Sequence, residues 1–264
     1  MEIEFFKFKL KGKTFVIIDW ANVYGWFSDS NSRTYLGWEV DPKKLFTYLK
    51  SYSNIIDINF YFGVESSRLK SVSFKKEIGN IGYFHISKEV KWVPAALETT
   101  THFKVLVRRL FNALDNIKNT NLAISNRMHD SFRVIEEVLE SGYNRSTIGK
   151  SAYIKLIKEL DEDLQKLNID ITELQVLLKE PVQRRKCDFD VEISRDIYNN
   201  IRNFETMIIF SGDGDYAALV EDLILKGKKV IVVFAAGHKG KEYEDFKRGL
   251  FLCPIKKLKP FIAK

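Results

Sequence analysis

The chain has 264 residues and a net charge of +7, with 45% hydrophobic residues, which suffices for one large domain with a sizeable core. Two cysteines without metal-ligand spacing argue against a disulfide framework or a zinc site, and no apolar run approaches the roughly 20 residues that span a bilayer. We therefore expect a cytoplasmic protein without a signal peptide or a membrane partner, whose basic charge would suit a polyanion.

Apolar runs and turn residues in the first third of the chain predict an alternation of strands and helices. Alternating apolar and charged side chains at 3–10 indicate a half-buried strand, whereas continuous apolar runs are typical of buried parallel strands. Pro42 suits the first turn of a helix. Strands are expected at 3–10, 14–19, 55–64 and 82–93, and helices at 41–53 and 71–80.

The pattern changes at 100–180, where glycine is nearly absent and apolar residues recur at helical spacing. We interpret this segment as a helical insertion within a single domain spanning 1–264, because strand and helix patterns alternate again after it. Helices are expected at 191–204 and 215–227, and strands at 206–210 and 228–234. This order predicts an α/β fold with a mainly parallel sheet and right-handed crossovers.

Acidic residues stand at the ends of predicted strands or at a helix start, where the functional side chains of open parallel sheets gather. There are three clusters: Asp19 with Asn22, Asp213 with Asp215 in SGDGD, and Asp188 with Asp190 in KCDFD, followed by Asp196. Carboxylates that converge on one crevice repel each other unless a cation lies between them. Hard oxygen ligands favour Mg²⁺ or Mn²⁺, which assist phosphoryl displacement. Gly212 and Gly214 would let the backbone turn sharply, so that both neighbouring aspartates face the crevice.

Each acid cluster also has a purely structural interpretation. Aspartate is a good helix N-cap, which would account for Asp213 and for Asp188 or Asp190. Asp215 would then be a favourable acid in a first helical turn, and Asp19 a solvated acid at the end of a strand. All three clusters would have to be coincidences at one edge of one sheet, so we favour a shared metal site.

Three segments resemble the motifs of the NYN domain family, in its LabA-like branch, which belongs to the PIN-like ribonuclease superfamily. FVIIDWANVY is similar to the family's opening strand with D-x-x-N, and KCDFDVEISRDI to its K-G-x-x-D-V-x-L-x-x-D segment. FSGDGDYAALVEDLILKGKKVIVV is similar to its S-G-D-x-D-[FY]-x-x-L-[VI] segment. The three occur in family order and cover about half of the chain. The resemblance implies a three-layer α/β/α sandwich and metal-dependent cleavage of RNA phosphodiester bonds.

Residue by residue, the resemblance implies four catalytic acids that bind Mg²⁺ or Mn²⁺: Asp19, Asp190, Asp213 and Asp215. It implies supporting roles for four others: Asn22, Ser211, Asp188 and Asp196. Trp20 departs from the small residue usual after the first aspartate, so it would narrow the crevice or stack on a base. The long insertion is a second departure, and substrate choice or assembly would differ with it.

Basic and aromatic residues indicate where RNA would contact the protein. Residues 226–264 hold eleven lysines and arginines against three acids, which accounts for the whole net charge. The expected RNA contacts are Arg184, Arg185, Lys186, Lys239, Lys241, Tyr24 and Trp26, with Lys186 at the position of the family's motif lysine. A solvated linker is the competing interpretation of QRRK at 183–186, and core packing that of the aromatic residues.

Together, the residues and the resemblance favour a metal-dependent ribonuclease that prefers single-stranded RNA. Two other classes stay open: a non-catalytic RNA- or protein-binding module on the same scaffold, and a phosphatase or nucleotide-hydrolysing enzyme. The complete set of acids favours the ribonuclease, because a binding module has no need to keep their repulsion. The insertion at 100–180 is expected to be a lid or the surface of a homodimer.

Overall fold

The computed structural model describes residues 6–28, 34–94, 183–246 and 248–264, together with the single positions 155, 158 and 162. Contacts divide the chain into two compact units, residues 1–90 with 187–264, and residues 91–186. The expected insertion at 100–180, with its lid or dimer surface, lies outside the described residues except for those three positions. The first unit carries the predicted acids.

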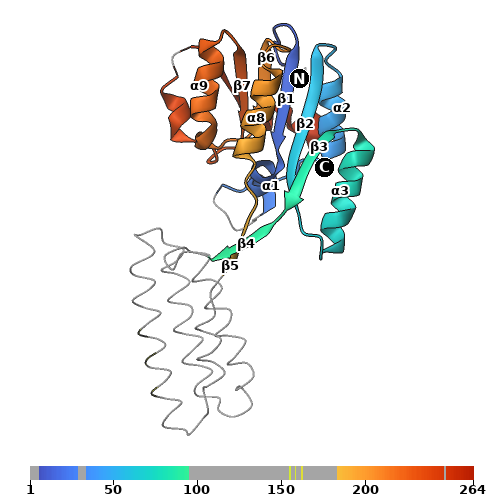
Figure 1. The fold of residues 1–264 in the computed structure, drawn as a ribbon, viewed down its shortest axis with the longest axis vertical. Helices are drawn as coiled ribbons and strands as arrows, with labels where there is room; N and C mark the ends of the chain where they lie inside the picture. Colours follow the sequence, from blue (N-terminus) through green and yellow to red (C-terminus); the bar gives the residue numbers. More distant parts are fainter. Residues whose placement is uncertain are drawn as a thin grey trace. The chain divides into compact units, whose positions relative to one another are not determined.

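A six-stranded parallel sheet forms the centre of the first unit (Figure 1). The strands are β1 (Thr14–Asp19), β2 (Ile55–Val64), β3 (Phe84–Glu89), β6 (Thr206–Phe210), β7 (Lys229–Phe234) and β8 (Leu250–Pro254). Their order is β3-β2-β1-β6-β7-β8, and every neighbouring pair is parallel. The expected parallel α/β fold is confirmed. Because the order reverses between β1 and β6, the crevice outside their carboxyl ends is where ligands of such sheets bind.

Helices cover both faces of this sheet and make three layers. One face carries α1 (Trp20–Ser28), α2 (Pro42–Lys50), α3 (Leu69–Ile81) and α10 (Lys259–Ile262), and the other α8 (Asp190–Asn200) and α9 (Ala217–Leu225). Short 3-10 segments are η1 (Gly214–Tyr216), η2 (Lys241–Glu244) and η3 (Ile255–Leu258). Asp41 caps α2 through the N–H groups of Lys43 and Lys44, which explains why that helix begins at Pro42.

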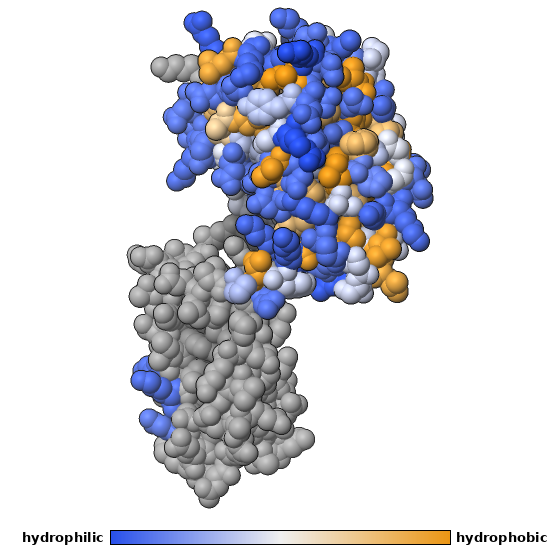
Figure 2. Space-filling view, viewed as in Figure 1, coloured by the Kyte–Doolittle hydropathy of each residue, from blue (hydrophilic) through white to orange (hydrophobic). Residues whose placement is uncertain are grey.

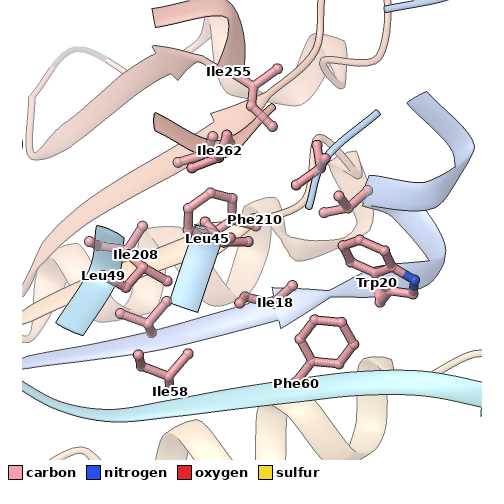
Figure 3. Close-up of a cluster of buried hydrophobic side chains, with 14 of the residues drawn as sticks. Ile18, Trp20, Leu45, Leu49, Ile58, Phe60, Ile208, Phe210, Ile255 and Ile262 are labelled. Carbon is pink, nitrogen blue, oxygen red and sulfur yellow. The ribbon is translucent and has the colours of Figure 1, made fainter. Parts of the chain in front are cut away.

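The side chains of β1 divide the core between the two faces, as the period of two in a strand requires. Val16 and Ile18 enter one buried cluster, whereas Phe15 and Ile17 enter the other. Figure 3 shows the first cluster, in which Ile18 lies beside side chains of neighbouring strands and of α2. By the same alternation, Asp19 follows Phe15 and Ile17 onto the face covered by α8 and α9.

Two expected strands differ from the structure. Residues 6–10 pair with no strand; instead the ring of Phe8 packs against Tyr48 and Tyr52, and its N–H donates to the Tyr52 hydroxyl at 2.9 Å. The alternation of apolar and charged residues at 6–10 therefore reflects a segment with one buried side, which forms no hydrogen-bonded pairing with another strand. The single strand expected at 82–93 is split, because β3 ends at Glu89 and β4 (Lys91–Pro94) pairs antiparallel with β5 (Gln183–Lys186) in the second unit.

The surface that Figure 2 shows on the first unit is largely hydrophilic, with apolar residues scattered among polar ones. Within the described parts of the chain, no helix combines the length and apolar character that crossing a membrane requires.

Candidate active site

Three aspartates meet at the crevice outside β1 and β6. Asp19 ends β1, Asp213 lies three residues beyond the end of β6, and Asp190 begins α8. The charges of Asp190 and Asp213 both raise the pKa of Asp19, and that of Asp213 raises the pKa of Asp190, so the three carboxylates act on one another. We call Asp19, Asp190 and Asp213 the acid cluster. It joins three segments that are far apart in the sequence.

Two polar side chains hold the cluster together. The Nδ2 of Asn22 lies 3.4 Å from Oδ2 of Asp19 and 3.4 Å from Oδ2 of Asp213, so one amide donates to both carboxylates. The fully buried Ser211 hydroxyl donates to Oδ2 of Asp19 at 3.4 Å and accepts from the N–H of Asp213 at 3.3 Å. Asn22 and Ser211 are thus placed where a supporting role would need them.

Asp19 combines a structural role with an electrostatic cost. Its Oδ1 accepts the N–H of Asn22 at 3.3 Å, which caps the first turn of α1; the alternative expected for Asp19 was a solvated strand-end acid. The residue is only 7% exposed. Burial raises the pKa of Asp19 to about 6, with smaller contributions from the charges of Asp190 and Asp213, although the Asn22 hydrogen bonds oppose the shift. A cap at a solvated helix end would carry no such cost.

Asp190 and Asp188 have different positions at the start of α8. Partial burial is the main cause that raises the pKa of Asp190, followed by the charges of Asp188 and Asp213. Asp188 is exposed, and its Oδ1 accepts the N–H of Asp190 at 3.1 Å. Asp188 therefore orders the first turn of α8. The charge of Asp190 acts on Asp19, another member of the acid cluster.

Tyr216 is a member of the site that sequence reasoning missed. It is 2% exposed, and its pKa is raised by burial first and then by the charges of Asp19, Asp190 and Asp213. Its hydroxyl has no hydrogen-bond partner of good geometry among the described residues, yet it lies close enough to Asp190 to lower the pKa of that carboxyl. The aromatic position after SGDGD was the available signal, but the pattern admits phenylalanine and so does not reveal a hydroxyl.

The structure gives a different explanation from the expected one for glycine in the SGDGD loop. Neither Gly212 nor Gly214 has a positive φ, so the sharp-turn explanation is wrong. A Cβ on Gly212 would lie 1.7 Å from the carbonyl oxygen of His238, and one on Gly214 would lie 1.9 Å from Oε2 of Glu242. The N–H of Gly240 donates to the carbonyl of Gly212 at 2.7 Å. Close packing of two backbone segments thus requires Gly212, whereas a Cβ on Gly214 would meet only the end of the Glu242 side chain, which can move.

Two further predicted acids make other contacts. Asp215 is exposed in η1, where its N–H donates to Oδ1 of Asp213 at 3.1 Å, so Asp213 also acts as the N-cap of η1. Asp196 accepts the hydroxyl of Tyr61 at 2.8 Å and pairs with Arg195 at 3.1 Å. The structure therefore gives Asp196 a network of its own, and it leaves the carboxylate of Asp215 exposed beside Asp213.

Asp19 and Asp213 are the carboxylates best placed to hold a divalent cation. Within the described residues, no three carboxylate, imidazole or thiol groups are close enough together to share one ion. Asp19 and Asp213 nevertheless present oxygens on either side of the Asn22 amide. Mg²⁺ commonly takes one or two carboxylates and keeps several waters, and it does not need a cage made only of protein groups. The pair fits a hydrated Mg²⁺ or Mn²⁺.

Two tryptophans cannot stack on RNA as expected. Trp26 is fully buried in the core beneath α1. Trp20 is 8% exposed and packs against Phe60 at 5.0 Å and Phe74 at 5.7 Å between ring centroids, so it neither narrows the crevice nor reaches a base. Core packing was the correct interpretation for both. Tyr24 is half-exposed on α1, so its predicted RNA contact is sterically open.

The basic residues expected to contact RNA lie in two places. Lys239 and Lys241 flank Gly240, which packs against the SGDGD loop, and Lys239 forms an ion pair with Glu244 at 2.9 Å. Arg184, Arg185 and Lys186 are on β5 in the second unit. Other lysines of 226–264 are spread over the fold; Lys228, for example, donates to the carbonyl of Phe204. The tail therefore does not form a single basic strip.

The NYN domain model matches residues 114–249, slightly more than half of the chain. The chain belongs to the NYN domain family. The match contains Asp190, Ser211 and Asp213, whereas Asp19 and Asn22 precede it in the sequence. The expected family is thus confirmed.

Similar proteins include the "Low amplitude and bright protein LabA" of Synechococcus elongatus, which is 31% identical over 61 residues. That alignment covers 23% of this chain and 33% of the relative, so the chain spans about a third of LabA. A solved protein of unknown function from Vibrio parahaemolyticus is similar over 98% of this chain and 100% of that one, with a TM-score of 0.47 and 13% identity.

Proposed function

We propose that the acid cluster is the active centre of a ribonuclease that requires Mg²⁺ or Mn²⁺ and cleaves single-stranded RNA. One observation carries the proposal: three carboxylates from distant segments converge at the switch point of the sheet, where burial and mutual repulsion raise the pKa of two of them. Capping alone would not require that convergence. Membership of the NYN family, with its nuclease-type fold, supports the same reaction class.

Asp19 and Asp213 would hold the ion, because their Oδ2 atoms converge on one amide of Asn22. When bound, Mg²⁺ or Mn²⁺ lowers the pKa of a coordinated water and stabilises the charge that develops on the phosphate. Asn22 and Ser211 keep the Asp19 carboxylate in one orientation, as groups behind metal ligands commonly do.

In this proposal Asp190 would accept a proton from the attacking water. Its raised pKa makes it a better base than an ordinary aspartate, and it lies on α8, whereas Asp19 and Asp213 follow strands. Tyr216 remains protonated because burial and three carboxylates raise its pKa. Its hydroxyl opposes the upward shift of the Asp190 pKa and so lets that carboxylate stay ionised to lower pH than it otherwise would.

A comparison of substrates tests the reaction class. The purified chain is incubated with single-stranded RNA, duplex RNA, single-stranded DNA or mononucleotides, each with Mg²⁺, with Mn²⁺ or with excess EDTA. We expect cleavage of single-stranded RNA with either metal and none with EDTA. Full activity in EDTA would overturn the metal requirement. Phosphate release from mononucleotides without RNA cleavage would indicate a phosphatase, and binding without any turnover would indicate a non-catalytic module.

A further inference from the structure

We propose that Lys7, Lys9 and Lys11 bind the phosphate backbone of single-stranded RNA at a surface separate from the acid cluster. We call these three residues the lysine row. The inference rests on the proposed function for the identity of the polyanion. It goes beyond that function by assigning a surface that holds RNA away from the site of cleavage and takes no part in the chemistry.

Side chains of the core hold the backbone of the lysine row in place. The N–H of Phe8 donates to the hydroxyl of Tyr52 at 2.9 Å. The N–H of Lys11 donates to Oγ1 of Thr206 at 3.2 Å, and the carbonyl oxygen of Lys11 accepts the same hydroxyl at 2.7 Å. Because these bonds act near both ends of the row, it has a fixed place on the fold although it belongs to no strand.

The three lysines lie on one side of the segment that carries them. Burial alternates along residues 6–11 with a period of two, which is the period of an extended chain. Phe8 is buried, and Phe6 and Leu10 pack against the same core cluster. The lysines that follow each of these three residues are all exposed. Successive lysines of the row are therefore about 7 Å apart along the backbone.

The surroundings of the lysine row are basic. Within the described residues, no carboxylate forms an ion pair with any of its three lysines. Two more ammonium groups flank the row, because Nζ of Lys229 donates to the carbonyl of Lys9 and Nζ of Lys257 lies 5.6 Å from the ring centroid of Phe6. The carboxylate of Glu205 accepts a backbone N–H just beyond the row. Charges about 7 Å apart are within the Debye length of about 8 Å at physiological salt, so the lysines repel each other and a polyanion would relieve that repulsion.

The lysine row offers charge without an apolar contact. Phe6, Phe8 and Leu10 are packed against the core, so this segment presents neither a ring to a base nor an apolar group to lipid. Peripheral binding to membranes commonly adds buried apolar area to the attraction of lysines for anionic lipids, and the row supplies only the second. A regular row of point charges instead suits the regular phosphates of a nucleic acid strand. We therefore expect binding that does not depend on the base sequence.

The lysine row and the acid cluster lie at opposite ends of β1. Lys11 bonds to Thr206, the first residue of β6, so the row is at the amino ends of the parallel strands. Asp19 ends β1, which begins at Thr14. At about 3.3 Å per residue, the strand alone separates the two places by roughly 17 Å. A long RNA could therefore occupy both places at once, whereas a short one could not.

Binding of a long single-stranded RNA is measured in EDTA by fluorescence anisotropy at several salt concentrations. The variants are Lys9→Gln, the pair Lys7→Gln/Lys11→Gln, and the triple variant that combines all three changes. Each lost phosphate contact should flatten the slope of log affinity against log salt by roughly 0.7, so the slopes should change by about 0.7, 1.4 and 2.1. An abasic sugar-phosphate chain of the same length should show the same three steps, because the row contacts no base.

A matched pair separates a local effect from a general effect of net charge. Lys70→Gln/Lys76→Gln removes two exposed lysines from α3 and should keep the wild-type slope. A wild-type slope in the triple variant would overturn the inference, and the row would then be only a solvated face. Equal flattening by the α3 pair and by Lys7→Gln/Lys11→Gln would overturn it as well. So would a wild type that binds phosphatidylserine vesicles through the row but does not bind RNA.

The two proposals can fail independently. If the wild type binds RNA through the lysine row but cuts nothing with any metal, the row inference stands and the ribonuclease proposal falls. If the triple variant binds as the wild type does while cleavage continues, the row inference falls and the ribonuclease stands. With both correct, the triple variant should raise KM for a long RNA and leave kcat unchanged. For an oligonucleotide too short to reach from the acid cluster to the row, it should change neither.

Discussion

Replacing the buried Asp19 with asparagine should stabilise the metal-free protein at neutral pH. The wild-type carboxylate is 7% exposed, and burial together with the charges of Asp190 and Asp213 raises its pKa to about 6. Asparagine has nearly the same shape and keeps an oxygen for the N–H of Asn22, but carries no charge. The variant thus removes the electrostatic cost and retains the cap of α1, but the amide nitrogen in place of Oδ2 cannot accept the hydrogen bonds from Asn22 and Ser211.

The magnitude follows from the pKa of Asp19 in the two states. Between the ordinary value of 3.8 and about 6, the folded protein holds a proton that the unfolded chain releases, so stability falls as pH rises through that range. At about 1.4 kcal/mol for each tenfold change in proton affinity, the full loss is about 3 kcal/mol, reached above pH 6. The advantage of Asp19→Asn should therefore be at most about 3 kcal/mol at pH 8 and at most about half of that at pH 5, less the cost of the two hydrogen bonds lost at Oδ2.

Urea denaturation in EDTA at pH 5 and pH 8 measures both values, with tryptophan fluorescence as the signal of unfolding. Asp57→Asn, an exposed acid on β2, is the matched control and should change the free energy of unfolding by less than about 0.5 kcal/mol. A lower stability for Asp19→Asn than for wild type at pH 8 would refute the reasoning. Asp19 would then be a helix cap whose charge is needed.

Two further predictions concern the surroundings of the acid cluster. Tyr216→Phe should move the acid limb of the cleavage pH profile to higher pH, because its hydroxyl lowers the pKa of Asp190; an unmoved limb with only a lower melting temperature would make Tyr216 structural. Gly212→Ala should lower the stability by roughly 1–3 kcal/mol or more, because its Cβ would meet the carbonyl of His238. Gly25 lies in α1 with open space around it, so Gly25→Ala should raise the stability by about 0.5–1 kcal/mol. Equal effects of Gly212→Ala and Gly25→Ala on the stability would contradict the close packing of the loop.

The sequence alone was enough to predict the parallel sheet and the proximity of the aspartates at one of its edges. Buried runs such as 14–19 and 206–210 are long, apolar and bounded, and this favours strands whatever surrounds them. Acids that follow such strands must lie at one edge of a parallel sheet. Asp19 and Asp213 were therefore predictable as neighbours from the sequence alone, and Asp190 was predictable through its motif.

Features that depend on tertiary contacts could not be predicted in the same way. The burial of Trp20 and Trp26 depends on which face α1 turns to the sheet, and a run of mixed aromatic residues does not decide that. The requirement for Gly212 arises from His238, 26 residues away, so no local pattern contains it. The network of Asp196 likewise depends on a tertiary contact, because Asp196 on α8 accepts a hydrogen bond from the hydroxyl of Tyr61 on β2.

The most direct test of the acid cluster is the single-turnover rate of RNA cleavage by Asp213→Asn with saturating Mn²⁺. Asparagine is as good an N-cap as aspartate, so η1 should persist and circular dichroism should match the wild type. We predict that the cleavage rate falls at least about 100-fold, as the loss of a group that holds charge in a reaction centre commonly costs. Affinity for RNA in EDTA should be unchanged or tighter. A folded Asp213→Asn that cleaves RNA at the wild-type rate, while Asp57→Asn does the same, would contradict the account.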